Sequence, residues 1–310
     1  MNKYIKKWKL RLSSGNLNEI IPILSMMLGA ATISFSAVYV KLVNVTPSVS
    51  AFYRMFFGGV MLLFIVIFQK KRCWHSTRHF TFSVIAALAM AINLVIWHIS
   101  ILYIGPGLAT ILGNFQVFIM ALFGFLIFKE KLKIRFIFSI LLAFTGLFLV
   151  VGSNWDQASE SYQFGIYLGF AVATCYAIYL LFLRAMQTMD RPLSSVTNLF
   201  IISIISTLIL FIIAIFKQES LLIPDIHSLI YLMCYGFFTQ VIGWVIIAWS
   251  MPRIKASLAG FILLMQPALT FVWDVLFFDR LLNWVIATGI FIALAAIYMG
   301  TSGGSSSSKH

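Results

Sequence analysis

Acidic side chains that could carry a proton or hold an ion are scarce, with nine Asp and Glu among 310 residues. Eight of the nine fall in tails, connections or the ends of apolar runs. Asp274 is the exception, because it lies about one turn inside an apolar run, where a carboxylate needs water or a partner. Arg54 enters another run to a similar depth. We expect both to face one cavity and to pair there; a snorkelling arginine and a hydrated carboxylate are the alternative.

Amide side chains lie deeper in the apolar runs, and two of them precede a tryptophan by four residues. The spacing places Asn93 with Trp97, and Gln240 with Trp244, on one helix face. This pattern predicts an aromatic-walled cavity with amide donors and acceptors. For each amide the alternative is a hydrogen bond that joins helices. The expected substrate-binding residues are Asn93, Trp97, Asn114, Gln116, Tyr176, Tyr179, Gln240, Trp244 and Gln266.

Two further residues have properties suited to gating or coupling. Pro267 removes a backbone hydrogen bond within an apolar run and could act as a hinge, with a static kink as the alternative. His98 is a second titratable group at a depth like that of Arg54. We expect gating or coupling at Arg54, His98, Pro267 and Asp274.

The three cysteines have no metal-binding spacing, and no phosphate loop, metal cluster or nucleophile elbow occurs in the sequence. The expectation is therefore no metal, no cofactor and no enzymatic activity.

Composition excludes a soluble domain, since 61% of the residues are hydrophobic and 10% are charged. A membrane-spanning helix needs about 20 apolar residues. The sequence predicts an all-α polytopic membrane protein with ten transmembrane helices, near residues 20–40, 49–68, 80–103, 107–128, 136–151, 164–184, 196–216, 228–250, 257–278 and 281–299.

The basic residues predict the orientation of these helices. If the N-terminus is cytoplasmic, 17 Lys and Arg and then Lys309 fall on the cytoplasmic side. Lys41, Arg54, Lys217 and Arg280 remain on the outer side. The net charge of +13 is thereby explained without a nucleic-acid partner. We predict a bacterial inner-membrane protein whose N- and C-termini are both cytoplasmic.

The second half of the chain repeats the first. A shift of 150 residues lays 104–132 over 254–282 and aligns Gln116 with Gln266. Five helices per half is an odd number, so the halves have inverted topology, an architecture of many secondary transporters. The predicted organisation is a basic N-terminus (1–19), a first repeat (20–151), an outer loop (152–163), a second repeat (164–300) and a flexible tail (301–310).

Each half closes on a similar hairpin. A short loop leads to small residues (GLAT at 107–110, SLAG at 257–260), then to an apolar helix and a charged F-x-E/R-x-L end at 128–132 and 278–282. In this the chain resembles the EamA-type members of the drug/metabolite transporter superfamily. Pro267 matches the mid-helix proline of that family, and Glu130 its terminal glutamate. The resemblance implies a ten-span inner-membrane permease that often exports amino acids, other metabolites or drugs.

The expected function is secondary or facilitated transport of a small amphipathic metabolite, an amino acid or related compound, in the export direction by alternating access. A permease for drugs or for nucleobase- or nucleoside-type metabolites and a lipid flippase are alternatives within the transporter class. A non-transport membrane assembly subunit is the alternative from another class. The expected partners are a small-molecule substrate and membrane lipid, with no nucleic acid. The protein is expected to be a monomer or a weak homo-oligomer.

Overall fold

The computed structural model describes residues 17–116, 118–119, 134–151, 159–187, 189–250, 253, 262–263, 265–279, 281 and 284–303. All regular secondary structure in these ranges is helical. The helices are α2 (Leu17–Ser34), α3 (Ser36–Leu42), α4 (Pro47–Phe68), α5 (Thr77–Ile104), α6 (Pro106–Gly113), α8 (Ile134–Val151), α9 (Glu160–Gln187), α10 (Ser195–Phe216), α11 (Ile226–Cys234), η2 (Tyr235–Gly243), α12 (Trp244–Ser250), α14 (Met265–Phe278) and α15 (Trp284–Gly303).

Six helical segments within the described ranges are long and apolar enough to cross a bilayer: Ile20–Leu42, Pro47–Phe68, Thr77–Ile104, Glu160–Gln187, Ser195–Phe216 and Ile226–Ser250. Each coincides with a predicted run. Three shorter apolar helices, Ile137–Gly146, Met265–Phe278 and Trp284–Ala296, lie in three other runs. α6 occupies the start of the run at 107–128, and residues 120–133, with Glu130, lie outside the described part. The prediction of a helical, multi-pass membrane protein is confirmed.

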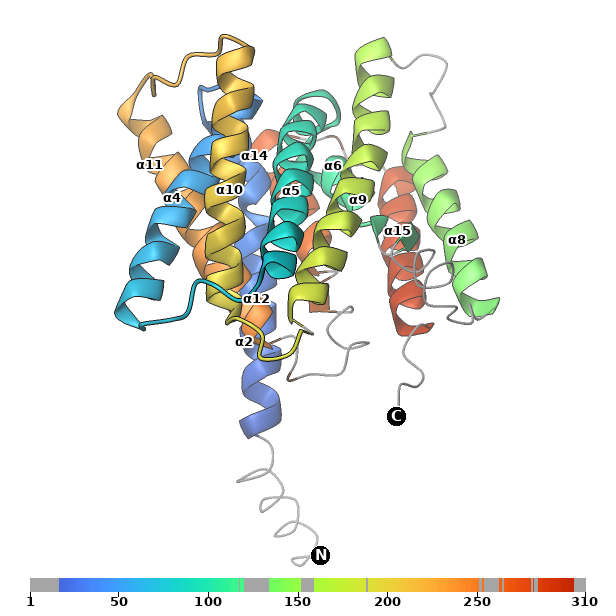
Figure 1. Cartoon of the computed structure of the whole chain (residues 1–310). Coiled ribbons are helices and arrows are strands. Elements are labelled where there is room, and N and C mark those ends of the chain that lie inside the picture. The colour runs from blue at the N-terminus through green and yellow to red at the C-terminus, as the bar shows by residue number, and fades with distance from the viewer. Residues whose placement is uncertain are drawn as a thin grey trace, which may run out of the picture.

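The repeat is visible in α4 and α10, which pack side by side in opposite directions (Figure 1). Both helices end in the same turn, with φ of 47° at Lys70 and 53° at Gln218. Lys70 N–H donates to Ile67 O at 3.0 Å, and Gln218 N–H donates to Ile215 O at 2.9 Å. These donors and acceptors correspond after a shift of 148 residues (218 − 70 and 215 − 67). The equivalent turns lie at opposite ends of the bundle, as inverted repeats require.

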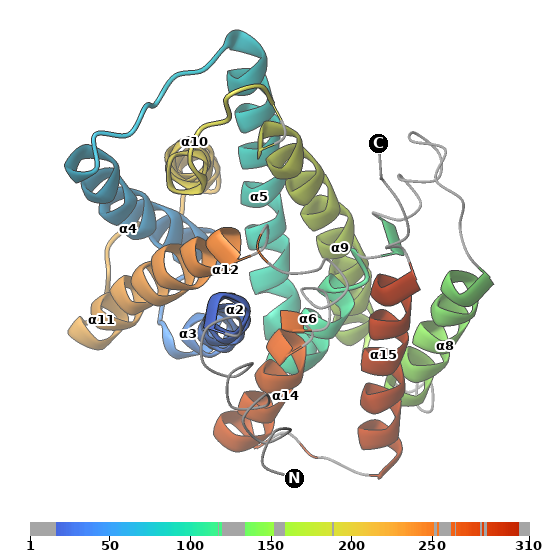
Figure 2. The same cartoon turned by 90° about the horizontal axis from the view of Figure 1, so that it is seen from below.

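Viewed along the bundle, α4, α10 and α11 lie on one side, and the α8–α15 pair lies on the other (Figure 2). Between them are α2, α5, α6, α9 and α14. Glycine allows two of the close helix crossings in this arrangement. A Cβ at Gly236 of η2 would lie 2.9 Å from Gly58 N, and one at Gly107 of α6 would lie 2.4 Å from Phe271 Cδ2. Both distances are too short for any side chain to be accommodated without movement.

Two helix irregularities lie near the centre. The first span breaks at Phe35, between α2 and α3, and Ser34 O accepts a hydrogen bond from Thr270 Oγ1 at 3.1 Å. Ser34 Oγ also accepts from Trp273 Nε1 at 2.9 Å, so α14 supplies partners at the break. The other irregularity is η2, a π-helix that begins at Tyr235. Such segments are frequent at functional sites because they redirect side chains.

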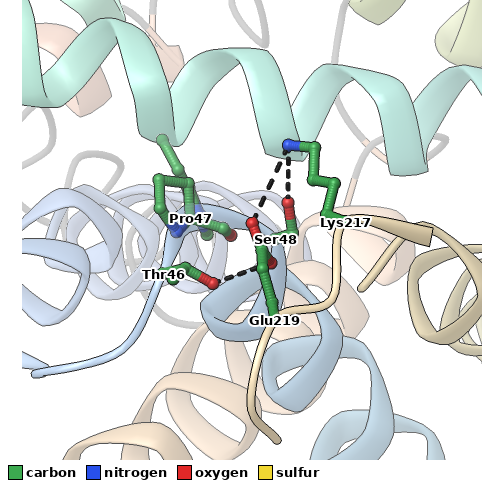
Figure 3. Close-up of polar contacts among 6 residues, drawn as sticks. Thr46, Pro47, Ser48, Lys217 and Glu219 are labelled. Carbon is green, nitrogen blue, oxygen red and sulfur yellow. Dashed lines mark hydrogen bonds and ion pairs between the residues drawn. The ribbon is translucent and has the colours of Figure 1, made fainter. Parts of the chain in front are cut away.

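At the upper end of Figure 1, the connections that flank α4 and α10 are joined by a set of polar contacts that we call the upper clasp (Figure 3). Lys217 Nζ lies 3.1 Å from Ser48 Oγ and 3.9 Å from Glu219 Oε1, and Thr46 Oγ1 donates to Glu219 Oε2 at 2.8 Å. The other members are Asn44, Asp225 and Ser228, with Asn44 N–H donating to Ser228 Oγ at 3.1 Å and Asn44 Nδ2 to Asp225 Oδ2 at 3.3 Å.

At the lower end, the connection from α4 to α5 meets the one from α9 to α10 in a lower clasp of His75, Ser76, His79, Asp190 and Asn198. His75 Nε2 donates to Asp190 O at 2.6 Å, and His79 Nε2 lies 2.9 Å from Asn198 Oδ1. A carbonyl oxygen accepts only, so both imidazoles carry a proton on Nε2. His79 and Asn198 are buried, at 2% and 0% exposure.

Candidate functional site

A cavity of about 70 Å³ lies where helices of both repeats meet, enough for several water molecules. It is bounded by α2, α3, α4, α5 and α6 from the first repeat and by α9, α12 and α14 from the second. Its described lining consists of Ile33, Ser36, Arg54, Met90, Asn93, Leu94, Trp97, Thr110, Gly113, Asn114, Val172, Tyr176, Trp244, Gln266 and Thr270.

Most of the residues expected to bind substrate line this cavity, although binding by them stays a prediction. Asn93, Trp97, Asn114, Tyr176, Trp244 and Gln266 are among the lining residues. The structure places Gln116, Tyr179 and Gln240 outside the described lining. The sequence argument missed Ser36, Thr110 and Thr270, whose short hydroxyl side chains occur throughout apolar helices and gave no spacing signal.

Two of the lining amides have a defined orientation. Asn93 Nδ2 donates to Val172 O at 2.9 Å, and Asn114 Nδ2 donates to Thr110 O at 2.8 Å. Because each partner is a carbonyl, the amide nitrogen must face it. The Oδ1 atoms of both residues accept no hydrogen bond from the described residues. The cavity is thus furnished with two amide oxygens that remain available as acceptors.

The aromatic wall is built in two layers. Tyr176 and Trp244 line the cavity with ring centroids 6.2 Å apart at 89°. Tyr179, at 1% exposure, stands behind them, stacked on Tyr176 at 6.0 Å and edge-on to Trp244 at 5.7 Å. Such packing fixes the orientation of the lining rings. Trp244 Nε1 is buried and has no hydrogen-bond partner among the described residues.

Gln240 is an amide that joins two helices by a hydrogen bond, which is the alternative to lining the cavity. Its Nε2 donates to Ser203 Oγ of α10 at 3.0 Å, so the side chain joins two helices. A Cβ at Gly58 would lie 2.5 Å from Gln240 Cγ, which shows how closely the side chain packs against α4. Gln116 is also buried, and its Oε1 has no partner within the described ranges.

A buried chain of hydrogen bonds borders the cavity. Arg54 Nη1 donates to Tyr235 Oη at 2.9 Å, and His98 Nε2 lies 2.9 Å from the same oxygen. His98 Nδ1 lies 3.0 Å from Pro47 O. Since that carbonyl can only accept, the proton of a neutral His98 is on Nδ1, and Tyr235 donates to Nε2. No pattern in the sequence singled out Tyr235, which lies where α11 passes into the π-helix η2.

Asp274 and Pro267 occupy different positions on α14. Asp274, at 2% exposure, accepts a hydrogen bond from Gly107 N at 3.1 Å, in the first turn of α6. A carboxylate at a helix N-terminus is favoured by the helix dipole. Pro267 lies within α14, two helical residues, Ile262 and Leu263, come shortly before that helix, and the hinge role of Pro267 stays a prediction. In this state no hydrogen bond or ion pair within 4.0 Å joins Arg54 to Asp274, and their pairing in another state of the protein stays a prediction.

The described residues contain no cluster of three or more His, Cys, Asp and Glu side chains that could hold a metal ion.

Comparisons with known proteins agree with this architecture. The model of the EamA-like transporter family matches residues 20–152 and 163–301. A solved crystal structure shares the fold, with a TM-score of 0.65 and 13% identity over 92% of this chain and 96% of that chain. No curated protein matches the sequence. The family match covers both halves of the chain, which therefore belongs to the EamA-like transporter family.

Proposed function

We propose that this protein exports a small amphipathic metabolite, an amino acid or related compound, across the bacterial inner membrane as a secondary or facilitated transporter. The observation that carries the proposal is a central cavity lined by both repeats, with aromatic walls and polar groups. In this proposal ten helices cross the membrane, and the two five-helix halves rock around the cavity to expose it to each side in turn.

The lining favours an amphipathic compound over a polyanion or a lipid. Trp97, Tyr176 and Trp244 offer ring faces to an apolar body. The free amide oxygens of Asn93 and Asn114 suit a hydrogen-bond donor such as an amino group. Arg54 is the charged residue of the described lining, and one cation is poorly matched to several phosphates.

The irregular helices support a rocking motion. The break at Phe35 and the π-helix η2 interrupt spans that border the cavity, and interrupted helices can bend there at low cost. For coupling to protons, Asp274 and His98 are the titratable candidates. Transport by Asp274→Asn at the wild-type rate, together with no response to a pH gradient, would exclude proton coupling through Asp274.

The proposed orientation has a direct test in Cys73, an exposed thiol in the connection from α4 to α5. With cytoplasmic termini, a membrane-impermeant maleimide should label Cys73 in inside-out vesicles and spare it in right-side-out vesicles. Cys73→Ser is the control, because Cys175 and Cys234 are partly buried within spans. Labelling of Cys73 from the outside would reverse the topology.

Transport is tested with purified protein in vesicles, using labelled amino acids and nucleobases with and without a pH gradient. We expect saturable flux of at least one amino acid, and an increase in KM of about tenfold for Asn114→Ala through loss of a hydrogen bond. Gln240→Ala is the matched control, since this amide lies outside the described lining; it should lower stability and leave KM unchanged. Absence of flux for every compound would contradict the proposal.

A further inference from the structure

Arg54 is a cation that has no anionic partner among the residues that the structure describes. Its side chain is buried, at 3% exposure, and it lines the cavity. Among the described residues, the ion pair within 4.0 Å is Lys217–Glu219 at the upper clasp, so no described carboxylate neutralises Arg54. A buried charge is expensive in a membrane unless another group compensates it.

The contacts of Arg54 orient it without neutralising it. Nη1 donates to Tyr235 Oη at 2.9 Å, and the guanidinium carbon lies 4.9 Å from the centre of the Tyr235 ring. Tyr235 is uncharged, and its own proton is directed to His98. Nε is buried with no partner, and Nη2 makes no hydrogen bond to a described residue. One edge of the guanidinium is therefore fixed, and the Nε–Nη2 edge is left unused.

An unused guanidinium edge matches one ligand chemistry in particular. Two parallel N–H donors on a planar fork fit the two oxygens of a carboxylate, and they bind it more strongly than a neutral acceptor. The low dielectric of the surrounding helices strengthens the interaction. Because this one guanidinium supplies the positive charge of the described lining, a monoanion fits it better than a dianion.

We propose that Arg54 binds the carboxylate of the transported compound and thereby selects monocarboxylates with an apolar body, which rests on Trp97, Tyr176 and Trp244. The inference rests on the proposed function and adds the group that the site recognises. Nε is enclosed in this state, so the carboxylate docks when the cavity is open. Arg54 is in this view a specificity-determining residue.

The test compares acids with their amides on purified protein in lipid nanodiscs. Binding is followed by the fluorescence of the lining tryptophans, with alanine, leucine and phenylalanine each paired with its amide. We expect at least one acid to bind at least about tenfold more tightly than its amide. Arg54→Gln should remove that preference, and Arg54→Lys should reduce it, because lysine keeps the charge and loses the fork.

Arg78→Gln is the matched control, since Arg78 also lies over an aromatic ring, 5.3 Å from the centre of Phe82, and is not a lining residue. The Arg78→Gln variant should bind acids over amides with the same preference as the wild-type protein. If Arg54→Gln fails to fold, Arg54→Lys still tests the fork. Equal binding of acids and amides, no binding of any acid, or an undiminished preference in the Arg54 variants would each overturn the inference.

Flux measurements separate this inference from the proposed function. Flux of a compound without any preference for its carboxylate overturns the role of Arg54 and leaves the transporter proposal standing. Tight, carboxylate-dependent binding without flux in vesicles upholds the role of Arg54 and contradicts transport.

Discussion

The two ends of the antiparallel α4–α10 pair are held together by different chemistry, although the repeat makes these ends equivalent in the backbone. The upper clasp uses Lys217, Glu219 and Asp225, and the side chain of Lys217 is 46% exposed. The lower clasp uses the His79–Asn198 pair, in which both residues are buried. Inverted repeats can thus keep one backbone geometry while each end acquires its own polar contacts.

From this difference we predict that the clasp with more charged residues is not the one that contributes more to the free energy of unfolding. Water screens exposed ion pairs, which typically contribute up to about 1 kcal/mol, whereas a buried polar group that loses its partner costs about 1–3 kcal/mol. We therefore expect the lower clasp to be the more sensitive of the two to mutation.

The largest effect is expected for His79→Ala. The substitution leaves Asn198 Oδ1 without a partner, while Asn198 Nδ2 already has none among the described residues. The free energy of unfolding should fall by about 2–3 kcal/mol. Thermal unfolding in detergent measures this, and His79→Gln, which can still donate to Asn198, should recover part of it. An unchanged melting temperature for His79→Ala would show that the burial of the lower clasp contributes nothing.

Asp225→Asn probes the charge of the upper clasp. The hydrogen bond from the backbone N–H of Ser228, and then that from its hydroxyl, hold the pKa of Asp225 below its ordinary value. A lowered folded-state pKa means that the carboxylate stabilises the protein above about pH 4 and loses this effect as the pH falls further. Wild type should melt above Asp225→Asn near neutral pH, and the two melting curves should converge in acid. A difference that does not shrink as the pH is lowered from about 4 would contradict this assignment.

Glycine substitutions test whether the two turns that end α4 and α10 are equivalent. Lys70 and Gln218 both adopt positive φ, a conformation that costs most residues about 1 kcal/mol and glycine almost nothing. Lys70→Gly and Gln218→Gly should each raise the free energy of unfolding by about 0.5–1 kcal/mol, because the two turns are equivalent. The same thermal assay measures both variants. If one substitution stabilised the protein and the other destabilised it, the two ends would differ in backbone as well as in side chains.

The smallest effect is expected for Glu219→Gln, which removes the negative charge beside Lys217 while an amide oxygen can still accept from Thr46. The ammonium of Lys217 is 3.9 Å from Glu219 Oε1 and 46% exposed, so the loss should be about 0.5 kcal/mol or less. The measurement is again the melting temperature, at low and at high salt, and salt should reduce the small difference further. A loss as large as that of His79→Ala would reverse the order proposed for the two clasps.

The sequence was most informative where composition and periodicity act over whole helices. Hydropathy located the described helices, and the four-residue spacing correctly placed Asn93 and Trp97 together on the cavity. The shift that aligns the halves was also readable, because a polar glutamine within an apolar run is a rare marker.

The contacts between helices were what the sequence could not supply. Tyr235 contacts Arg54 of α4 and His98 of α5, and the hydrophobic periodicity of its own helix carries no sign of either partner. Gln240 has the same spacing to a tryptophan as Asn93, yet it bonds to Ser203 outside the described lining. Which neighbour an amide finds depends on tertiary packing, and a single helix pattern does not contain that information.

The most direct test of the central claim, that the cavity between the repeats is the transport path, is the accessibility of Thr110 on α6. In a variant with Cys73, Cys175 and Cys234 replaced by serine, Thr110→Cys places a nearly isosteric thiol on the cavity wall. Ala143→Cys on α8, buried at 0% exposure and absent from the described lining, is the control. We predict that a membrane-impermeant thiol reagent modifies Thr110→Cys from either side of the membrane and leaves Ala143→Cys unmodified. Failure of the reagent to reach Thr110→Cys from either side would contradict a cavity that opens in turn to both.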